Sequence, residues 1–188
     1  MIRAISSITV LSVAALLAGS ASAEGAPQRR SAGVGVSPGE APKLAKEDRD
    51  LFDDAAQGGL LEVKLAENVV KQGASEDVKH FAQRMIDDHT KANQRLAAAA
   101  HQDGLSVPKD LDKKHQDTLE RFTQWSGTKL DREYMDEMVS EHKDDVKAFE
   151  RESKEGKAAG LRQFAASTLP TLREHLTLAQ QIQEHLKT

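Results

Sequence analysis

The chain has 188 residues, and its 26 lysines and arginines against 30 aspartates and glutamates give a formal net charge of −4. This balance lacks the basic excess typical of proteins that bind nucleic acid, so we expect no nucleic-acid partner. Cysteine is absent and only 4% of the residues are aromatic, which excludes disulfides and cysteine-based metal sites and leaves a largely aliphatic core.

The first segment, 1–23, has the features of a signal peptide. Arg3 precedes an apolar stretch over 5–17, and the small residues Ala-Ser-Ala at 21–23 form a cleavage signature before Glu24. The apolar stretch is too short to span a bilayer as a helix. We therefore expect a periplasmic or secreted protein without a transmembrane segment after cleavage.

The next segment, 24–46, is rich in Gly, Pro, Ser and Ala and lacks apolar periodicity, which predicts a flexible linker. From there to the end, over 47–188, apolar residues recur at helical spacing. Glycines 73, 104 and 156 punctuate this pattern. We expect four long helices, over about 48–72, 75–103, 128–155 and 157–186.

The connection between the second and third long helices is longer than the others. It contains Pro108 and then an amphipathic stretch with Leu111, Leu119, Phe122 and Trp125, which predicts a short extra helix. Two tight helical hairpins joined by one long connection are typical of the ferritin-like four-helix bundle. We therefore expect an all-α protein of that kind.

The inward-facing stripe of each expected long helix carries one side chain that can bind a metal. Each of these side chains lies about 14 or 15 residues from its helix start, roughly 21 Å along the axis. Because this is close to the middle of each helix, the four groups should share one layer of the bundle. They are Glu62, His89, His142 and His175.

Three imidazoles and a carboxylate are a suitable ligand set for a divalent transition metal such as copper, zinc or iron. The alternative is a structural polar layer, in which the same groups hydrogen-bond to one another and fix the helix register. Met85 and Met138 each precede a histidine by one turn. Their thioethers are either additional ligands, which would favour copper, or fillers of the apolar core.

An acidic residue directly precedes each of the three histidines. These residues are Asp88, Glu141 and Glu174. They point about 100° away from the inward stripe, so they could accept hydrogen bonds from imidazoles of neighbouring helices and act as second-shell groups. The alternative is that they are solvated surface charges.

Four stretches of the chain have a distinctive sequence: FDDAAQGGLLEV at 52–63, VKHFAQRMIDDH at 78–89, and the segments 134–146 and 164–175. Together they resemble the bacterial DUF4142 family of exported, ferritin-like proteins. The resemblance implies the fold and the exported location but no activity. Ferritin-like di-iron proteins use paired Glu-x-x-His motifs, whereas Ile86, Val139 and Leu172 occupy the corresponding positions here, which argues against a di-iron centre.

We interpret the chain as an exported helical bundle that binds a transition metal through the layer of Glu62, His89, His142 and His175. The alternative function is a non-catalytic envelope or stress-related interaction protein with a structural polar layer. The sequence contains no candidate nucleophilic constellation, so an enzymatic role stays open but is not favoured. It does not identify a protein partner.

Overall fold

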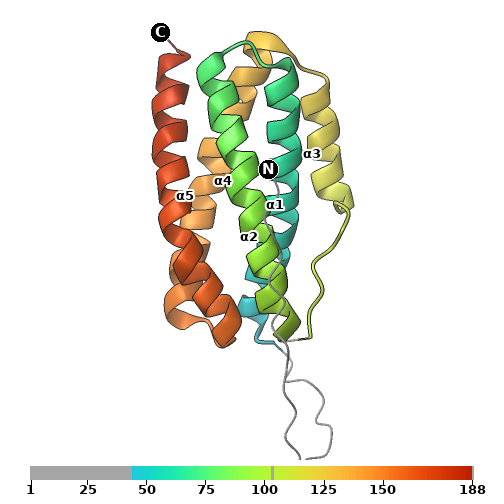
Figure 1. Ribbon diagram of the computed structural model, residues 1–188, viewed down its shortest axis with the longest axis vertical. Coiled ribbons are helices and arrows are strands. Elements are labelled where there is room, and N and C mark those ends of the chain that lie inside the picture. Colours follow the sequence, from blue (N-terminus) through green and yellow to red (C-terminus); the bar gives the residue numbers. More distant parts are fainter. Residues whose placement is uncertain (1–43, 103, 188) are drawn as a thin grey trace, which may run out of the picture. The chain divides into compact units, whose positions relative to one another are not determined.

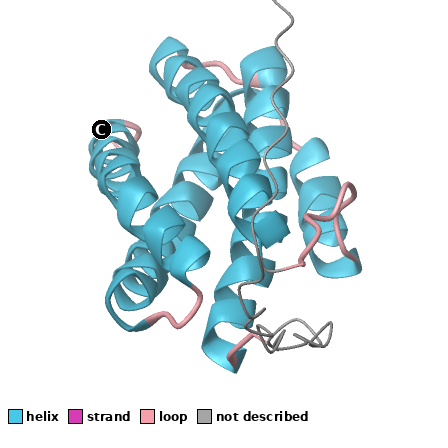
Figure 2. Ribbon diagram, turned by 60° about the horizontal axis from the view of Figure 1, so that its bottom comes forward, coloured by secondary structure: helices cyan, strands magenta, loops and turns pink. Residues whose placement is uncertain are grey.

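The computed structural model describes residues 44–102 and 104–187. The expected signal peptide and most of the expected linker, residues 24–43, lie outside the described residues. The described part forms helices and loops without any strand, as Figure 2 shows. The helices are α1 (Lys46–Gln72), α2 (Glu76–Gln102), α3 (Lys113–Thr123), α4 (Gly127–Glu155) and α5 (Ala159–His185).

Two antiparallel hairpins, α1–α2 and α4–α5, pack against each other. Helix α1 contacts α2 and α4, and α5 also contacts α2 and α4. In Figure 1, α1 and α5 run upward while α2 and α4 run downward, so neighbouring helices are antiparallel. Helix α3 lies in the connection between the hairpins and packs mainly on α1. The expected all-α helical bundle is confirmed.

The buried apolar residues form two clusters, one toward each end of the bundle. One cluster includes Val69, Met85, Tyr134 and Met138, and the other includes Phe52, Leu96, Phe149 and Leu161. Each long helix carries one buried polar residue near its centre, close to where the two clusters meet. These four residues are Glu62, His89, His142 and His175.

Each hairpin contributes a buried aspartate that accepts hydrogen bonds from backbone amides in the turn of the other hairpin. The Asp131 carboxylate, at the start of α4, accepts hydrogen bonds from the backbone amides of Ala74 at 3.1 Å and Ser75 at 2.8 Å. A Cβ at Gly73 would lie 2.6 Å from Asp131 Oδ1, so this close approach requires glycine.

The reciprocal contact involves Asp48 in the first turn of α1. Its carboxylate accepts from the amides of Lys157 at 2.9 Å and Ala158 at 2.7 Å in the α4–α5 turn. Both aspartates are only 1% exposed. We call these two contacts the aspartate latches. They fix the two hairpins to each other at opposite ends of the bundle, so the mid-helix residues meet in one layer.

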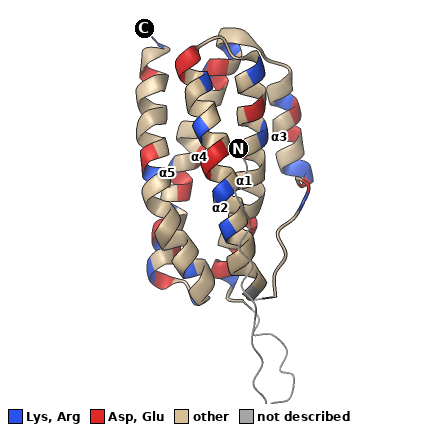
Figure 3. Ribbon diagram, in the orientation of Figure 1, with Lys and Arg blue, Asp and Glu red and all other residues tan. Residues whose placement is uncertain are grey.

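Charged residues of both signs occur on every helix, as the colouring of Figure 3 shows. The described residues include no helix that combines the length and apolar character needed to cross a membrane.

Candidate metal centre

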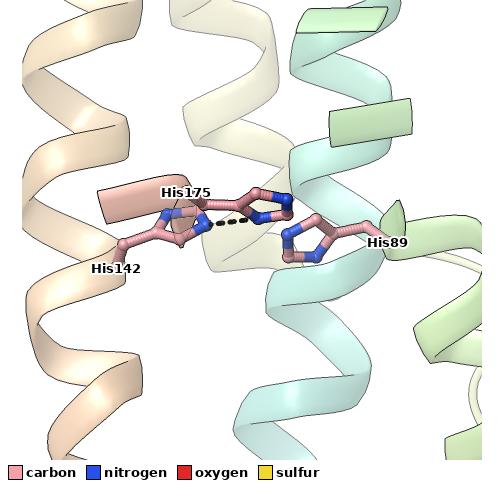
Figure 4. A group of neighbouring side chains, drawn as sticks. All are labelled: His89, His142 and His175. Carbon is pink, nitrogen blue, oxygen red and sulfur yellow. Dashed lines mark hydrogen bonds between the residues drawn. The ribbon is translucent and has the colours of Figure 1, made fainter. Parts of the chain in front are cut away.

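Three buried histidines meet at the centre of the bundle, between the two apolar clusters. His89 comes from α2, His142 from α4 and His175 from α5, and their ring centroids lie 5.4–5.6 Å apart in every pair. One nitrogen of each ring lies within 4.8 Å of the other two. Figure 4 shows the three rings converging from different helices on a common point.

Glu62 of α1 lies against this group and contacts His89 most closely. Its Oε2 is 2.8 Å from His89 Nδ1, and its Oε1 is 3.5 Å from His142 Nδ1. The carboxylate therefore engages the nitrogen of His89 that faces α1. The other nitrogen of His89, Nε2, is buried and has no hydrogen-bond partner in the described part of the chain.

The other two rings are also held by acceptors through one nitrogen each. His142 Nδ1 lies 3.0 Å from the carbonyl oxygen of Met138, in the preceding turn of α4. His175 Nε2 lies 3.0 Å from Asp88 Oδ2 on α2. A carbonyl and a carboxylate can only accept, so His142 carries its proton on Nδ1 and His175 carries its proton on Nε2.

This assignment leaves two unprotonated nitrogens facing each other. His142 Nε2 and His175 Nδ1 lie 3.4 Å apart, joined by the dashed line in Figure 4. Two lone pairs at this distance need a cation or a proton between them. Nitrogens that bind a metal at about 2.0–2.1 Å with tetrahedral angles lie roughly 3.3–3.4 Å apart, so the spacing of His142 and His175 suits a shared metal ion.

The protonation of the layer follows from its burial and from the Glu62 charge. Burial favours a neutral Glu62, but the neighbouring His89 and His142 outweigh it and hold the pKa of the carboxyl at about 2. Burial lowers the pKa of His142 to about 4 and also lowers the pKa of His175. For His89, the Glu62 charge and hydrogen bond overcome burial and raise its pKa above 6.5. Of the three histidines, His89 is therefore the one that is most readily protonated.

A small cavity of about 30 Å³ adjoins the histidine layer on the side of the cluster that contains Phe149. Glu62, His89 and Thr168 line it, and each has a buried polar atom without a hydrogen-bond partner among the described residues: Oε1, Nε2 and Oγ1. The cavity is large enough for a water molecule or an ion. The polar layer is thus incompletely satisfied by protein groups alone.

Asp145 also lines this cavity, and the stripe spacing did not identify it, because Asp145 and Val146 fit the inward position equally well. Burial and the Glu62 charge raise the pKa of Asp145 well above its usual value. The sequence does contain a pattern that points to Asp145. Asp145 follows the latch residue Asp131 by the same number of residues by which Glu62 follows Asp48.

The three acidic residues next to the histidines have different surroundings. Asp88 accepts a hydrogen bond from His175. Glu174 instead pairs with Arg84, which also binds Asp88. Glu141 is exposed and lines a surface groove. Met85 and Met138 are fully buried in the apolar cluster next to the layer.

Comparisons with known proteins bear on the fold. A family described as "Domain of unknown function (DUF4142)" matches residues 36–182. The chain is also similar to the crystal structure of a DUF305 fragment from Deinococcus radiodurans, with a TM-score of 0.64 and 10% sequence identity, over 77% of this chain and 99% of the fragment. At this identity, the likeness shows the helical fold alone. No curated protein matches the chain.

Proposed function

The chain belongs to the DUF4142 family, a domain of unknown function, and we propose that it binds one divalent transition-metal ion through His89, His142 and His175. One observation carries this proposal: the lone pairs of His142 Nε2 and His175 Nδ1 face each other at 3.4 Å. Hydrogen bonding to acceptors forces this arrangement. Nε2 of His89, buried and unpartnered, completes the set.

In this proposal, Glu62 acts through His89 and is not needed as a direct ligand. Metal-binding histidines commonly donate their second ring nitrogen to a carboxylate or a carbonyl, which fixes the ring and strengthens the ligand. The three acceptors here are Glu62 for His89, the Met138 carbonyl for His142 and Asp88 for His175. The small cavity beside the layer leaves room for a water molecule as a fourth ligand.

The rival is a structural polar layer that only fixes the helix register. In its favour, buried histidines and glutamates often satisfy one another by hydrogen bonding. Against it, Glu62 Oε1 and His89 Nε2 are buried without a hydrogen bond to any described group, which is costly in an apolar interior.

The ligand set also bears on which metal is bound, because neutral imidazoles suit zinc, copper, iron and nickel.

Isothermal titration calorimetry with zinc, copper, iron and manganese tests the proposal. We expect stoichiometric binding with a micromolar or lower Kd and release of protons at pH 6, because His89, whose pKa is raised by Glu62, must lose its proton before Nε2 can bind the ion. Below the pKa of His89, the affinity should fall about tenfold per pH unit. Buffers of different ionisation enthalpy give the number of protons released.

Glu62→Gln is the control for this prediction. Loss of the carboxylate charge lowers the pKa of His89, so fewer protons should leave on binding at pH 6. If the titrations show only the millimolar binding expected of surface histidines, the polar-layer reading is correct and the metal proposal is wrong.

We further propose that the bundle is of the ferritin-like kind and acts outside the cytoplasm. The two hairpins joined by the long connection support the first part, and the signal-peptide features of 1–23 support the second. N-terminal sequencing of the protein from a secreting host should begin at Glu24. Full-length protein retained in the cytosol would contradict export.

A further inference from the structure

A surface groove of about 360 Å³ runs between α1, α3 and α4. Carboxylates dominate its charged lining, which also includes Lys114 and His115 of α3. Six acidic side chains line the groove: Asp54, Glu62, Glu137, Glu141, Asp144 and Asp145.

Several of these carboxylates lack a compensating base. Glu137 lies 4.0 Å from Arg121, and Asp144 lies 2.8 Å from Lys147. Asp54 and Glu141 have no salt-bridge partner among the residues that the structure describes. Their uncompensated charges attract cations into the groove and repel anions.

The groove is continuous with the small cavity beside the histidines. Asp54, Gly58, Glu62 and Asp145 line both, and His89 lines the cavity. A chain of carboxylate oxygens therefore leads from the protein surface to the histidine layer.

A second observation connects this acidic groove to a ligand. Glu62 is only 4% exposed, and its Oε1 has no hydrogen-bond partner in the described part of the chain. The same side chain lines the groove and the cavity and contacts His89 through its other oxygen. A buried carboxylate oxygen that makes no hydrogen bond among the described residues thus lies where the groove meets the metal centre.

We infer that this groove is the path by which a hydrated divalent cation reaches the histidines, with Glu62 passing the ion from the groove to His89. The inference rests on the proposed metal site. Carboxylates are hard ligands that bind divalent cations and exchange with their water. The ion that enters is therefore a divalent one.

Gly58 keeps the path open. A Cβ at this position would meet no atom within 4 Å, whereas a Cβ at the next residue, Gly59, would lie 2.3 Å from Asn93 Oδ1. Because Gly58 lines both the groove and the cavity, a large side chain there would fill the passage without a clash at its Cβ.

The test measures loading and release of Co²⁺ by stopped-flow absorbance in Gly58→Leu, with Gly58→Ala as the matched control. Both substitutions remove a helix-interior glycine, so both should be at least as stable as wild type. We expect Gly58→Leu to slow loading and release by the same factor, at least fivefold, with the Kd within threefold of wild type. Gly58→Ala should load at nearly the wild-type rate.

A second arm probes charge. At low salt, Asp54→Asn combined with Glu141→Gln should slow loading several-fold, because attraction of the ion to the groove is weakened. The control, Asp53→Asn combined with Asp87→Asn, removes the same charge from exposed positions outside the groove and should load at a rate close to wild type.

The outcomes separate the two proposals. If wild type binds Co²⁺ but Gly58→Leu loads as fast as Gly58→Ala, the path is wrong and the metal site stands. A Gly58→Leu protein that is folded but has lost affinity with an unchanged loading rate also contradicts the path. If wild type binds no ion at all, both proposals fail together.

Discussion

His142→Ala is expected to lower the affinity for the metal ion at least 100-fold. The substitution removes one of three nitrogen ligands, and losing even a second-shell group typically costs about 10–100-fold. His142 is fully buried and is held in place by the Met138 carbonyl, so its Nε2 is fixed at the shared centre.

Thermal unfolding with and without metal provides the measurement. At a free metal concentration of about 100 times the Kd, binding adds roughly 2.7 kcal/mol to wild-type stability. The melting temperature of wild type should therefore fall when a chelator is added, while that of His142→Ala should fall much less, because a 100-fold weaker Kd leaves at most about 0.4 kcal/mol of stabilisation at the same metal concentration. His80→Ala, which truncates an exposed histidine on α2, should respond to the chelator like wild type. Equal responses in wild type and His142→Ala would rule out the site.

Asp131→Ala is expected to produce the largest loss of stability, about 2–4 kcal/mol in the absence of metal. It leaves the amides of Ala74 and Ser75 without their acceptor, and each unsatisfied donor costs about 1–3 kcal/mol. Asp131→Asn should cost less, because an amide oxygen can still accept one bond. Urea unfolding monitored by circular dichroism gives these differences.

The reciprocal variant, Asp48→Ala, should cost less than Asp131→Ala. Asp48 lies near Glu152, and burial together with the Asp48 charge raises the pKa of the Glu152 carboxyl to about 6. Removing Asp48 relieves this repulsion at neutral pH and offsets part of the lost hydrogen bonding. Asp53→Ala, at an exposed position on α1, should change stability by less than about 0.5 kcal/mol. If Asp131→Ala behaves like Asp53→Ala, the aspartate latches do not hold the hairpins together.

The helices and the polar layer could be predicted because both depend on local periodicity. Apolar spacing identifies the buried face of a helix, and equal depth along helices of similar length predicts that His89, His142 and His175 lie in one layer. The structure brings these three residues together. The N-cap at Ser75 was also predictable, and its Oγ accepts from the Val78 amide at 3.4 Å.

The partners of individual side chains could not be predicted in the same way. Asp131 appears in the sequence as an ordinary first-turn acid of its own helix, yet its carboxylate binds the turn of the other hairpin. Asp88 and Glu174 both precede a histidine, but only Asp88 contacts an imidazole, because Glu174 faces Arg84. Such choices depend on how two helices far apart in sequence are rotated against each other, which periodicity within one helix does not determine.

The reciprocal placement of Asp48 and Asp131 has a kinetic consequence. Each carboxylate belongs to one hairpin and its amides to the other, so both contacts form only after the hairpins have docked. Interactions that form late in folding mainly slow unfolding. Asp131→Ala should therefore raise the unfolding rate more than it lowers the refolding rate. Two carboxylates at the ends of the bundle thus govern its lifetime, and with it the longest time for which an ion held between the hairpins can stay bound.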